Sequence, residues 1–104
     1  GADVALCGAD ESGAAETADA VRKLGRRSFH LAFDIADDAA LTGFGDAAAD
    51  FLGRVDGLVN NAGTNIFAGV SGATRPVIAR CLDVNFMPCW MLSRQLRPYL
   101  ARSR

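Results

Sequence analysis

One polar side chain stands among apolar residues near the end of the chain, at Asn85. Its neighbours Val84, Phe86 and Met87 are apolar, so its amide must find hydrogen-bond partners or cost about 1–3 kcal/mol. Pro88 cannot donate a hydrogen bond to the carbonyl of Val84, which predicts a bend in a helix here. A freed carbonyl and an amide at one bend can hold an ordered water. The alternative is that Asn85 simply ties two core segments together.

Two further groups of polar residues stand where apolar runs end. The run at 55–59 passes into Asn-Asn-Ala-Gly at 60–63, and the alternating run at 29–35 carries Asp34 near its end. Short side chains and glycine let a backbone come close to a ligand, and a carboxylate accepts hydrogen bonds from an amine. Taken alone, the first group forms a turn equally well, and Asp34 equally well favours a helix start.

The sequence offers few metal ligands. His30 is the only histidine and has apolar residues at 29, 31 and 33, so we expect it on the surface of a sheet. Cys7, Cys81 and Cys89 form no Cys-x-x-Cys pair. A zinc site needs three or four convergent donors, so we expect no metal. An odd number of dispersed cysteines favours a reducing compartment, and we expect a cytoplasmic protein.

Length and charge limit the function. The chain has 104 residues and holds at most one domain, which we place at 1–104. Its 11 basic and 12 acidic residues give a net charge of −1, which argues against nucleic-acid and anionic-membrane partners. No apolar run approaches the roughly 18 residues of a membrane span. The chain opens on Gly1 and an apolar run without a signal peptide, so we expect a piece of a longer polypeptide.

Hydrophobic periodicity predicts the elements that position these residues. We expect strands at 3–7, 29–35 and 55–59, helices at 12–24, 37–53 and 76–102, and a loop at 64–73. Strands that alternate with helices form a parallel sheet with helices on both faces, so the expected fold class is α/β. A flavodoxin-like or another three-layer α/β domain fits the same pattern.

The last predicted helix is apolar around most of its circumference. Its apolar residues include Val77, Ile78, Leu82, Phe86, Trp90, Leu92 and Leu96. Such a helix is buried on all sides, so one face packs on its own sheet and the other needs a further element or another subunit. The arginines that gather toward its C-terminal half are interpreted as a solvated strip that complements the helix dipole. They are Arg80, Arg94, Arg97, Arg102 and Arg104.

Spaced motifs over the whole chain resemble the short-chain dehydrogenase/reductase family. Asn-Asn-Ala-Gly at 60–63 resembles the motif that ends the family's fourth strand, and Asp34-Ile35 resembles the pair that ends its third strand. Leu-Asp-Val-Asn at 82–85 resembles the part of its fourth helix that carries an asparagine. The resemblance implies a Rossmann-type parallel sheet without the first strand and the C-terminal strands, and therefore a partial NAD(P)-binding domain.

The resemblance also implies roles for single residues. Asp34 is similar to the residue whose carboxylate accepts a hydrogen bond from the adenine amino group, and Ile35 to its backbone partner beneath the ring. Asn61, Ala62 and Gly63 resemble the strand end that lies against the cofactor ribose.

The resemblance gives Asn85 a place in the family's catalytic tetrad. The main-chain carbonyl of that asparagine holds a water that joins a proton relay. The bend that Pro88 predicts favours the same geometry by an independent route.

Other parts of the family's machinery find no match. The Gly-rich phosphate loop, the catalytic serine and the Tyr-x-x-x-Lys pair are absent, since Tyr99 is the only tyrosine and Lys23 the only lysine. We expect the segment by itself to be inactive and poorly stable, because two of its strands lack the neighbour between them. The resemblance implies that the full-length protein interconverts an alcohol and a carbonyl by hydride transfer. The alternative is a non-catalytic nucleotide-binding or subunit-interaction module.

The sequence and the resemblance predict the choice between NAD and NADP, the substrate and the partners only in part. The residues after the first strand contain neither the acidic residue of NAD-preferring relatives nor the arginine of many NADP-preferring ones. Asp10 is a candidate for the ribose diols, and its charge leans the expectation for NAD or NADP toward NAD, although it equally starts the next helix. The substrate is a small alcohol or carbonyl compound that no residue specifies. The apolar helix implies a homodimer or homotetramer of the full-length protein, built on residues 76–100.

Overall fold

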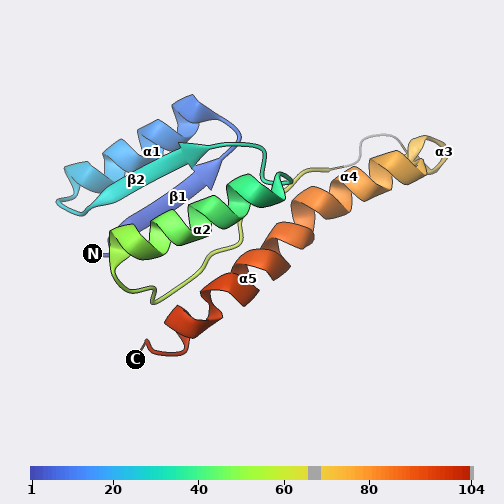
Figure 1. Cartoon of the computed structure of the whole chain (residues 1–104). Helices are drawn as coiled ribbons and strands as arrows, with labels where there is room; N and C mark the ends of the chain where they lie inside the picture. Colours follow the sequence, from blue (N-terminus) through green and yellow to red (C-terminus); the bar gives the residue numbers. More distant parts are fainter. Residues whose placement is uncertain (66–68, 104) are drawn as a thin grey trace.

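The chain folds into a two-stranded parallel sheet with helices on both faces. A computed structural model describes residues 1–65 and 69–103. Its elements are β1 (Val4–Gly8), α1 (Glu11–Lys23), β2 (Ser28–Ala32), α2 (Asp38–Leu52), α3 (Gly69–Gly72), α4 (Arg75–Asn85) and α5 (Met87–Leu100). The strands pair in register from Val4 opposite Ser28 to Gly8 opposite Ala32. Figure 1 shows α1 on one side of the sheet and α2 with α5 on the other, which confirms the predicted α/β class.

Alternate strand residues face the two helical layers. Ala5, Cys7 and Phe29 pack against the core that α2 and α5 form, and burial raises the pKa of the Cys7 thiol, which therefore stays protonated. On the other face, Nε2 of His30 lies 2.7 Å from Oε1 of Glu11 in α1. His30 is thus a sheet-surface residue, as predicted. Within 1–65 and 69–103 no group of three metal-binding side chains occurs.

Helix α2 lies between the sheet and α5 and supplies most of the core. The buried core residues are Leu41, Phe44, Ala48, Ala49, Val55, Leu92 and Leu96. The ring of Phe29 in β2 lies 6.1 Å from that of Phe44 and 4.9 Å from that of Phe51, the second in an edge-on arrangement. The helix predicted at 37–53 is confirmed, with Leu41, Phe44 and Ala48 on its buried face. It ends, also as predicted, at Gly53, whose φ of 73° is the left-handed conformation typical of a helix end.

Gly45 in α2 allows α5 to come close. A Cβ at this position would overlap the side-chain amide of Gln95. Nε2 of Gln95 donates to the carbonyl of Thr42 and to Oδ1 of Asp46, both at 2.9 Å. The glycine weakens the helix by about 1 kcal/mol relative to alanine, and these two hydrogen bonds between α5 and α2 occupy the space it leaves.

Asp10 is the N-cap of α1, which is the second of its two predicted roles. Its Oδ1 accepts from the backbone N–H of Ser12 at 3.2 Å, and its Oδ2 accepts from that of Gly13 at 3.1 Å. A Cβ at Gly13 would lie 2.8 Å from Oδ2 of Asp10, so the glycine keeps this cap open. Both carboxylate oxygens therefore serve the helix start.

Replacing Asp10 with alanine should lower the free energy of unfolding by about 1 kcal/mol, because two backbone N–H groups lose their acceptor. The measurement is urea unfolding followed by circular dichroism. Asp10→Asn is the matched control, because asparagine caps as well as aspartate. Equal midpoints for Asp10→Ala and Asp10→Asn would contradict the capping role.

The strand predicted at 55–59 is wrong as a strand. Val55 is buried and Leu58 packs against the core, but the sheet contains β1 and β2 alone among the described residues. No backbone hydrogen bond found in the described parts of the chain joins 55–60 to either strand. A strand exists only beside a partner, and no strand lies next to this segment. The apolar pattern therefore predicted the burial of Val55 and Leu58 but not the pairing of the segment, and Val59 is 87% exposed.

The single helix predicted at 76–102 is also wrong, because two helices meet at Phe86. Phe86 has φ −111° and ψ −55°, and Pro88 occupies the first turn of α5, where a missing N–H costs least. The irregularity that Pro88 predicts occurs two residues earlier as a one-residue interruption, in which the N–H of Phe86 still donates to the carbonyl of Leu82. One face is uncovered in this chain, since Leu82, Phe86 and Trp90 are 53–59% exposed. The further element or second subunit expected to cover that face stays a prediction.

Other boundaries shift by a few residues. The strand predicted at 29–35 ends at Ala32, since Phe33, Asp34 and Ile35 lie beyond the paired region. The loop predicted at 64–73 contains the short helix α3, and its residues 66–68 lie outside the described part. No helix in that part is long and apolar enough to cross a membrane.

Candidate functional site

The segment after β2, the segment after residue 60 and helix α4 meet at one end of the molecule (Figure 1). Two polar bridges join α4 to these segments. One runs from Asn85 to Thr64 and the other from Arg80 to Asp34. Three of the predicted site segments are thus brought together at the carboxyl end of the strand region, where parallel sheets bind ligands.

Asn85 binds the backbone of Thr64 through both ends of its amide. The N–H of Thr64 donates to Oδ1 of Asn85 at 2.7 Å, and Nδ2 of Asn85 donates to the carbonyl of Thr64 at 2.8 Å. This pairing copies the way two strands exchange hydrogen bonds. It holds the Asn-Asn-Ala-Gly segment against α4. A Cβ at Gly63 would lie 3.1 Å from Oδ1 of Asn85, so the glycine permits the close approach.

Two half-buried cysteines flank Asn85 one helical turn away on either side. Nδ2 of Asn85 lies 3.1 Å from Sγ of Cys81. Sγ of Cys89 lies 3.4 Å from the main-chain carbonyl of Asn85. The carbonyl of Asn85 therefore lies at the break between α4 and α5 with a weak thiol donor beside it. The alternative that Asn85 ties segments together describes its side chain, and its carbonyl is a separate group.

Asp34 forms a two-pronged ion pair with Arg80 of α4. Nη2 of Arg80 lies 3.1 Å from Oδ1, and Nη1 lies 3.1 Å from Oδ2. The N–H of Ala36 also donates to Oδ1 at 3.0 Å. The hydrogen bonds from Arg80 and Ala36 hold the pKa of the Asp34 carboxyl below its usual range. The carboxylate thus stays charged in moderately acidic solution.

The pKa of Asp34 should rise toward the usual aspartate range in Arg80→Met, because the charged form loses its main hydrogen bond. The ion pair is present above the usual aspartate pKa and is lost as the pH falls through the lowered value in the folded chain. Carbon-13 NMR titration of the Asp34 carboxyl measures its pKa in the natural sequence and in Arg80→Met. Arg94→Met, on the exposed side of α5, is the control. The same Asp34 pKa in Arg80→Met and Arg94→Met would contradict the assignment.

A cavity of about 280 Å³ lies beside both bridges. Its lining residues are Thr64, Asn65, Pro76, Val77, Arg80 and Cys81. Thr64 and Asn65 line it from the segment after residue 60, and α4 contributes both apolar residues and the charged Arg80. Such a mixture suits a ring with a polar edge.

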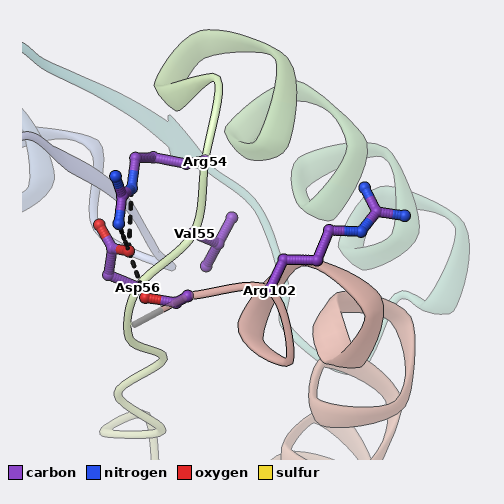
Figure 2. A pocket seen from close by; sticks show the side chains of 5 residues that line it. Arg54, Val55, Asp56 and Arg102 are labelled. Atoms are coloured by element: carbon purple, nitrogen blue, oxygen red, sulfur yellow. Dashed lines mark hydrogen bonds and ion pairs between the residues drawn. The ribbon is translucent and has the colours of Figure 1, made fainter.

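A second cavity, of about 300 Å³, lies at the far end of α5 (Figure 2). Arg54 and Asp56 line it as a directly paired couple, with Nε of Arg54 2.9 Å from Oδ1 of Asp56 (Figure 2). The hydroxyl of Ser103 donates to the same Oδ1. These groups satisfy one another, and α5 separates them from Asn85 by about 20 Å. We therefore place the candidate site at the first cavity.

The remaining predicted residues lie near the site in different settings. Ile35 is half-buried and packs against the core, whereas Asn61, Ala62 and Gly63 are exposed in an extended segment. Asp10 lies after β1 and caps α1.

Sequence reasoning missed Arg80, Thr64 and Cys81. Arg80 is 56% exposed, as a residue of a solvated strip should be, but that interpretation did not include its ion pair with Asp34. The two residues are 46 positions apart and belong to different elements. No periodicity links them, although an acidic residue expected at a ligand site is itself a signal to look for a basic partner.

Comparison with known proteins decides the family. The family model for short chain dehydrogenases matches residues 1–104. The chain belongs to the short chain dehydrogenase family. The chain is 29% identical to the ketoacyl reductase HetN of Nostoc sp. over 97 residues. This match covers 93% of the chain and 34% of that protein. The chain is 32% identical over 79 residues to a putative ketoacyl reductase of the granaticin polyketide synthase of Streptomyces violaceoruber, covering 73% and 32%.

Solved structures of the short chain dehydrogenase family share the fold. A short-chain dehydrogenase/reductase from Serratia marcescens superposes with a TM-score of 0.87 at 31% identity, over 96% of this chain and 41% of that one. A 7α-hydroxysteroid dehydrogenase, solved with NADH and a 7-oxo bile acid conjugate, superposes with a TM-score of 0.86 at 28% identity, over 95% and 38%. The chain therefore spans about a third of the length of these curated relatives and about two fifths of the solved ones.

Proposed function

We propose that the full-length protein is an NAD(P)-dependent oxidoreductase that interconverts an alcohol and a carbonyl compound by hydride transfer. The observation that carries the proposal is the bidentate Asn85–Thr64 bridge in a chain of the short chain dehydrogenase family. It binds the predicted cofactor-facing segment to the helix that carries the predicted relay residue. The nicotinamide supplies the hydride chemistry when bound, and the protein positions it.

The residues at the strand ends fit the adenosine half of such a cofactor. The Asp34 side chain is 54% exposed and ionised, and an exocyclic amine needs an acceptor of this kind. In our proposal Ile35 lies beneath the adenine through its backbone, and Asn61, Ala62 and Gly63 border the ribose. These last three residues are short and exposed, so a ligand can approach their backbone. Asp10 keeps acceptor positions beyond its cap bonds, and we retain it for the ribose diols with a preference for NAD.

Asn85 acts in this proposal as a positioning residue through its main chain. Its side chain is engaged by Thr64 and Cys81. Its carbonyl lies at the helix break and is the group that we propose to hold a relay water. Proton transfer through such a relay contributes about 10²–10⁴-fold to the rate.

The proposal extends to the remaining segments of the full-length protein, its oligomeric state and its compartment. We propose that residues 1–104 are part of an NAD(P)-binding domain whose phosphate loop and Ser, Tyr and Lys lie in other segments of the full-length chain, and that these 104 residues alone transfer no hydride. The exposed apolar residues of α4 and α5 support a homodimer or homotetramer. Three free cysteines support a reducing compartment, for which we propose the cytoplasm.

The test begins with the coding sequence on both sides of residues 1–104. We expect a Gly-rich loop on one side and a serine with Tyr-x-x-x-Lys on the other. The complete protein is then assayed for NADH- and NADPH-dependent reduction of a panel of ketones, aldehydes and keto esters. Turnover supports the proposal. Tight binding of dinucleotide without turnover of any carbonyl would instead support the non-catalytic module.

A further inference from the structure

Arg80 pairs with Asp34 through both of its terminal nitrogens. These nitrogens lie 3.1 Å from the two oxygens of Asp34, across 46 residues of sequence. This end-on, two-point arrangement fixes the plane of the carboxylate as well as its place. Arg80 also lines the cavity of about 280 Å³ beside α4.

We propose that Arg80 is a positioning residue for adenine recognition, which orients the Asp34 carboxylate so that one oxygen accepts from the exocyclic amine of the base. This inference rests on the proposed function, since it requires an adenine nucleotide at Asp34. It adds a residue from α4 that the family motifs in this chain do not include.

The acceptor positions on Asp34 determine which oxygen serves. Oδ1 already accepts from Arg80 and from the N–H of Ala36. Oδ2 lies 3.1 Å from Nη1 of Arg80 in the ion pair, and no hydrogen bond found within the described residues ends on it. Each carboxylate oxygen has about two acceptor positions, so Oδ1 is filled while Oδ2 keeps acceptor capacity. Arg80 and Ala36 together therefore leave Oδ2 as the oxygen that can accept from a ligand.

The positive charge of Arg80 also favours binding of a dinucleotide at Asp34. A dinucleotide is itself negatively charged, and Asp34 alone would add a full negative charge at the site. The guanidinium makes the pair neutral, which weakens the long-range repulsion and leaves the oxygen as an acceptor. Lysine is a poor replacement, because its single ammonium cannot hold both oxygens in one plane.

A dinucleotide whose base lacks the exocyclic amine distinguishes recognition of adenine from binding of the rest of the dinucleotide. Hypoxanthine carries a carbonyl where adenine carries its amine, so a dinucleotide with hypoxanthine directs an acceptor at Oδ2. Dissociation constants of NADH and of its hypoxanthine analogue are measured by fluorescence with the full-length protein. We expect the natural protein to favour the adenine form by at least about tenfold, as for a hydrogen bond to a charged group.

Variants of Arg80 should change that preference. Arg80→Met should reduce the ratio to below about threefold, and Arg80→Lys should give an intermediate value. Arg94→Met removes an exposed arginine from α5 and should keep the natural ratio. Exposed ion pairs contribute little to folding, so the variants should keep the natural circular dichroism spectrum and melting temperature.

Each outcome decides a different point. A natural ratio in folded Arg80→Met would overturn the inference and leave Arg80 as a structural tie, and Arg80→Lys supplies the same test if Arg80→Met does not fold. Equal affinities in the natural protein would overturn the inference and leave the dinucleotide proposal standing. Failure of both dinucleotides to bind would overturn the proposed function and the inference together.

Discussion

Replacing Asn85 with alanine should lower kcat of the full-length protein by about 100-fold or more, with a smaller change in KM for the carbonyl substrate. The side chain supplies two hydrogen bonds to the backbone of Thr64. Their loss frees both the segment proposed to face the cofactor and the helix junction that holds the Asn85 carbonyl. The proposed proton relay depends on that carbonyl position, and the contribution of such a relay lies in the range of about 10²–10⁴.

Asn85→Asp provides a sharper comparison than alanine alone. Aspartate still accepts from the N–H of Thr64, but it offers a second acceptor where Nδ2 donates to the Thr64 carbonyl. Two acceptors then face each other, so we expect activity no higher than in Asn85→Ala. Ser93→Ala, at an exposed position of α5, is the control. Steady-state kinetics and the pH profile of kcat distinguish the roles, because a merely structural effect would leave the profile unchanged. An Asn85→Ala enzyme with natural kcat would contradict the relay.

Replacing Leu41 with alanine should lower the free energy of unfolding by about 2–5 kcal/mol. Leu41 is 1% exposed and is the largest of the fully buried side chains in the described residues. It lies in the layer that α2 forms between the sheet and α5. A domain of ordinary stability has about 5–15 kcal/mol in total, so this one substitution removes a large share.

Leu24→Ala is the matched control for Leu41→Ala. Leu24 follows α1 and is 82% exposed, so the same chemical change should cost less than about 0.5 kcal/mol. Urea unfolding with fluorescence and circular dichroism measures both variants. Similar midpoints for the two would show that α2 is not the centre of the core.

The parts of the fold that depend on local sequence could be predicted. Helix α2 follows from apolar residues three and four apart, from Asp37 as its cap and from Gly53 at its end. The cap of α1 and the break near Pro88 follow from similar local chemistry. Each of these features involves residues within about one or two helical turns, so the sequence nearby contains the cause.

Features that need a distant partner could not be predicted from pattern. An apolar run at 55–59 is compatible with a strand, but pairing requires a neighbour that no property of the run supplies. What covers the exposed apolar face of α4 could not be predicted for a similar reason. The spacing of apolar residues indicates that a helix face is apolar, but it does not indicate which element packs on that face. Family motifs predicted Asp34 and Asn85, and the structure joins each to an unforeseen partner, Arg80 and Thr64.

The contact of Gly45 with Gln95 limits which substitutions relatives can accept at these two positions. A Cβ at 45 would overlap the glutamine amide as it stands, so the flexible glutamine would swing away and lose its bonds to Thr42 and Asp46. Replacing either residue first therefore costs these two hydrogen bonds. In descendants of a common ancestor, a larger residue at 45 should accompany a shorter one at 95, so that the two positions are inherited as a pair.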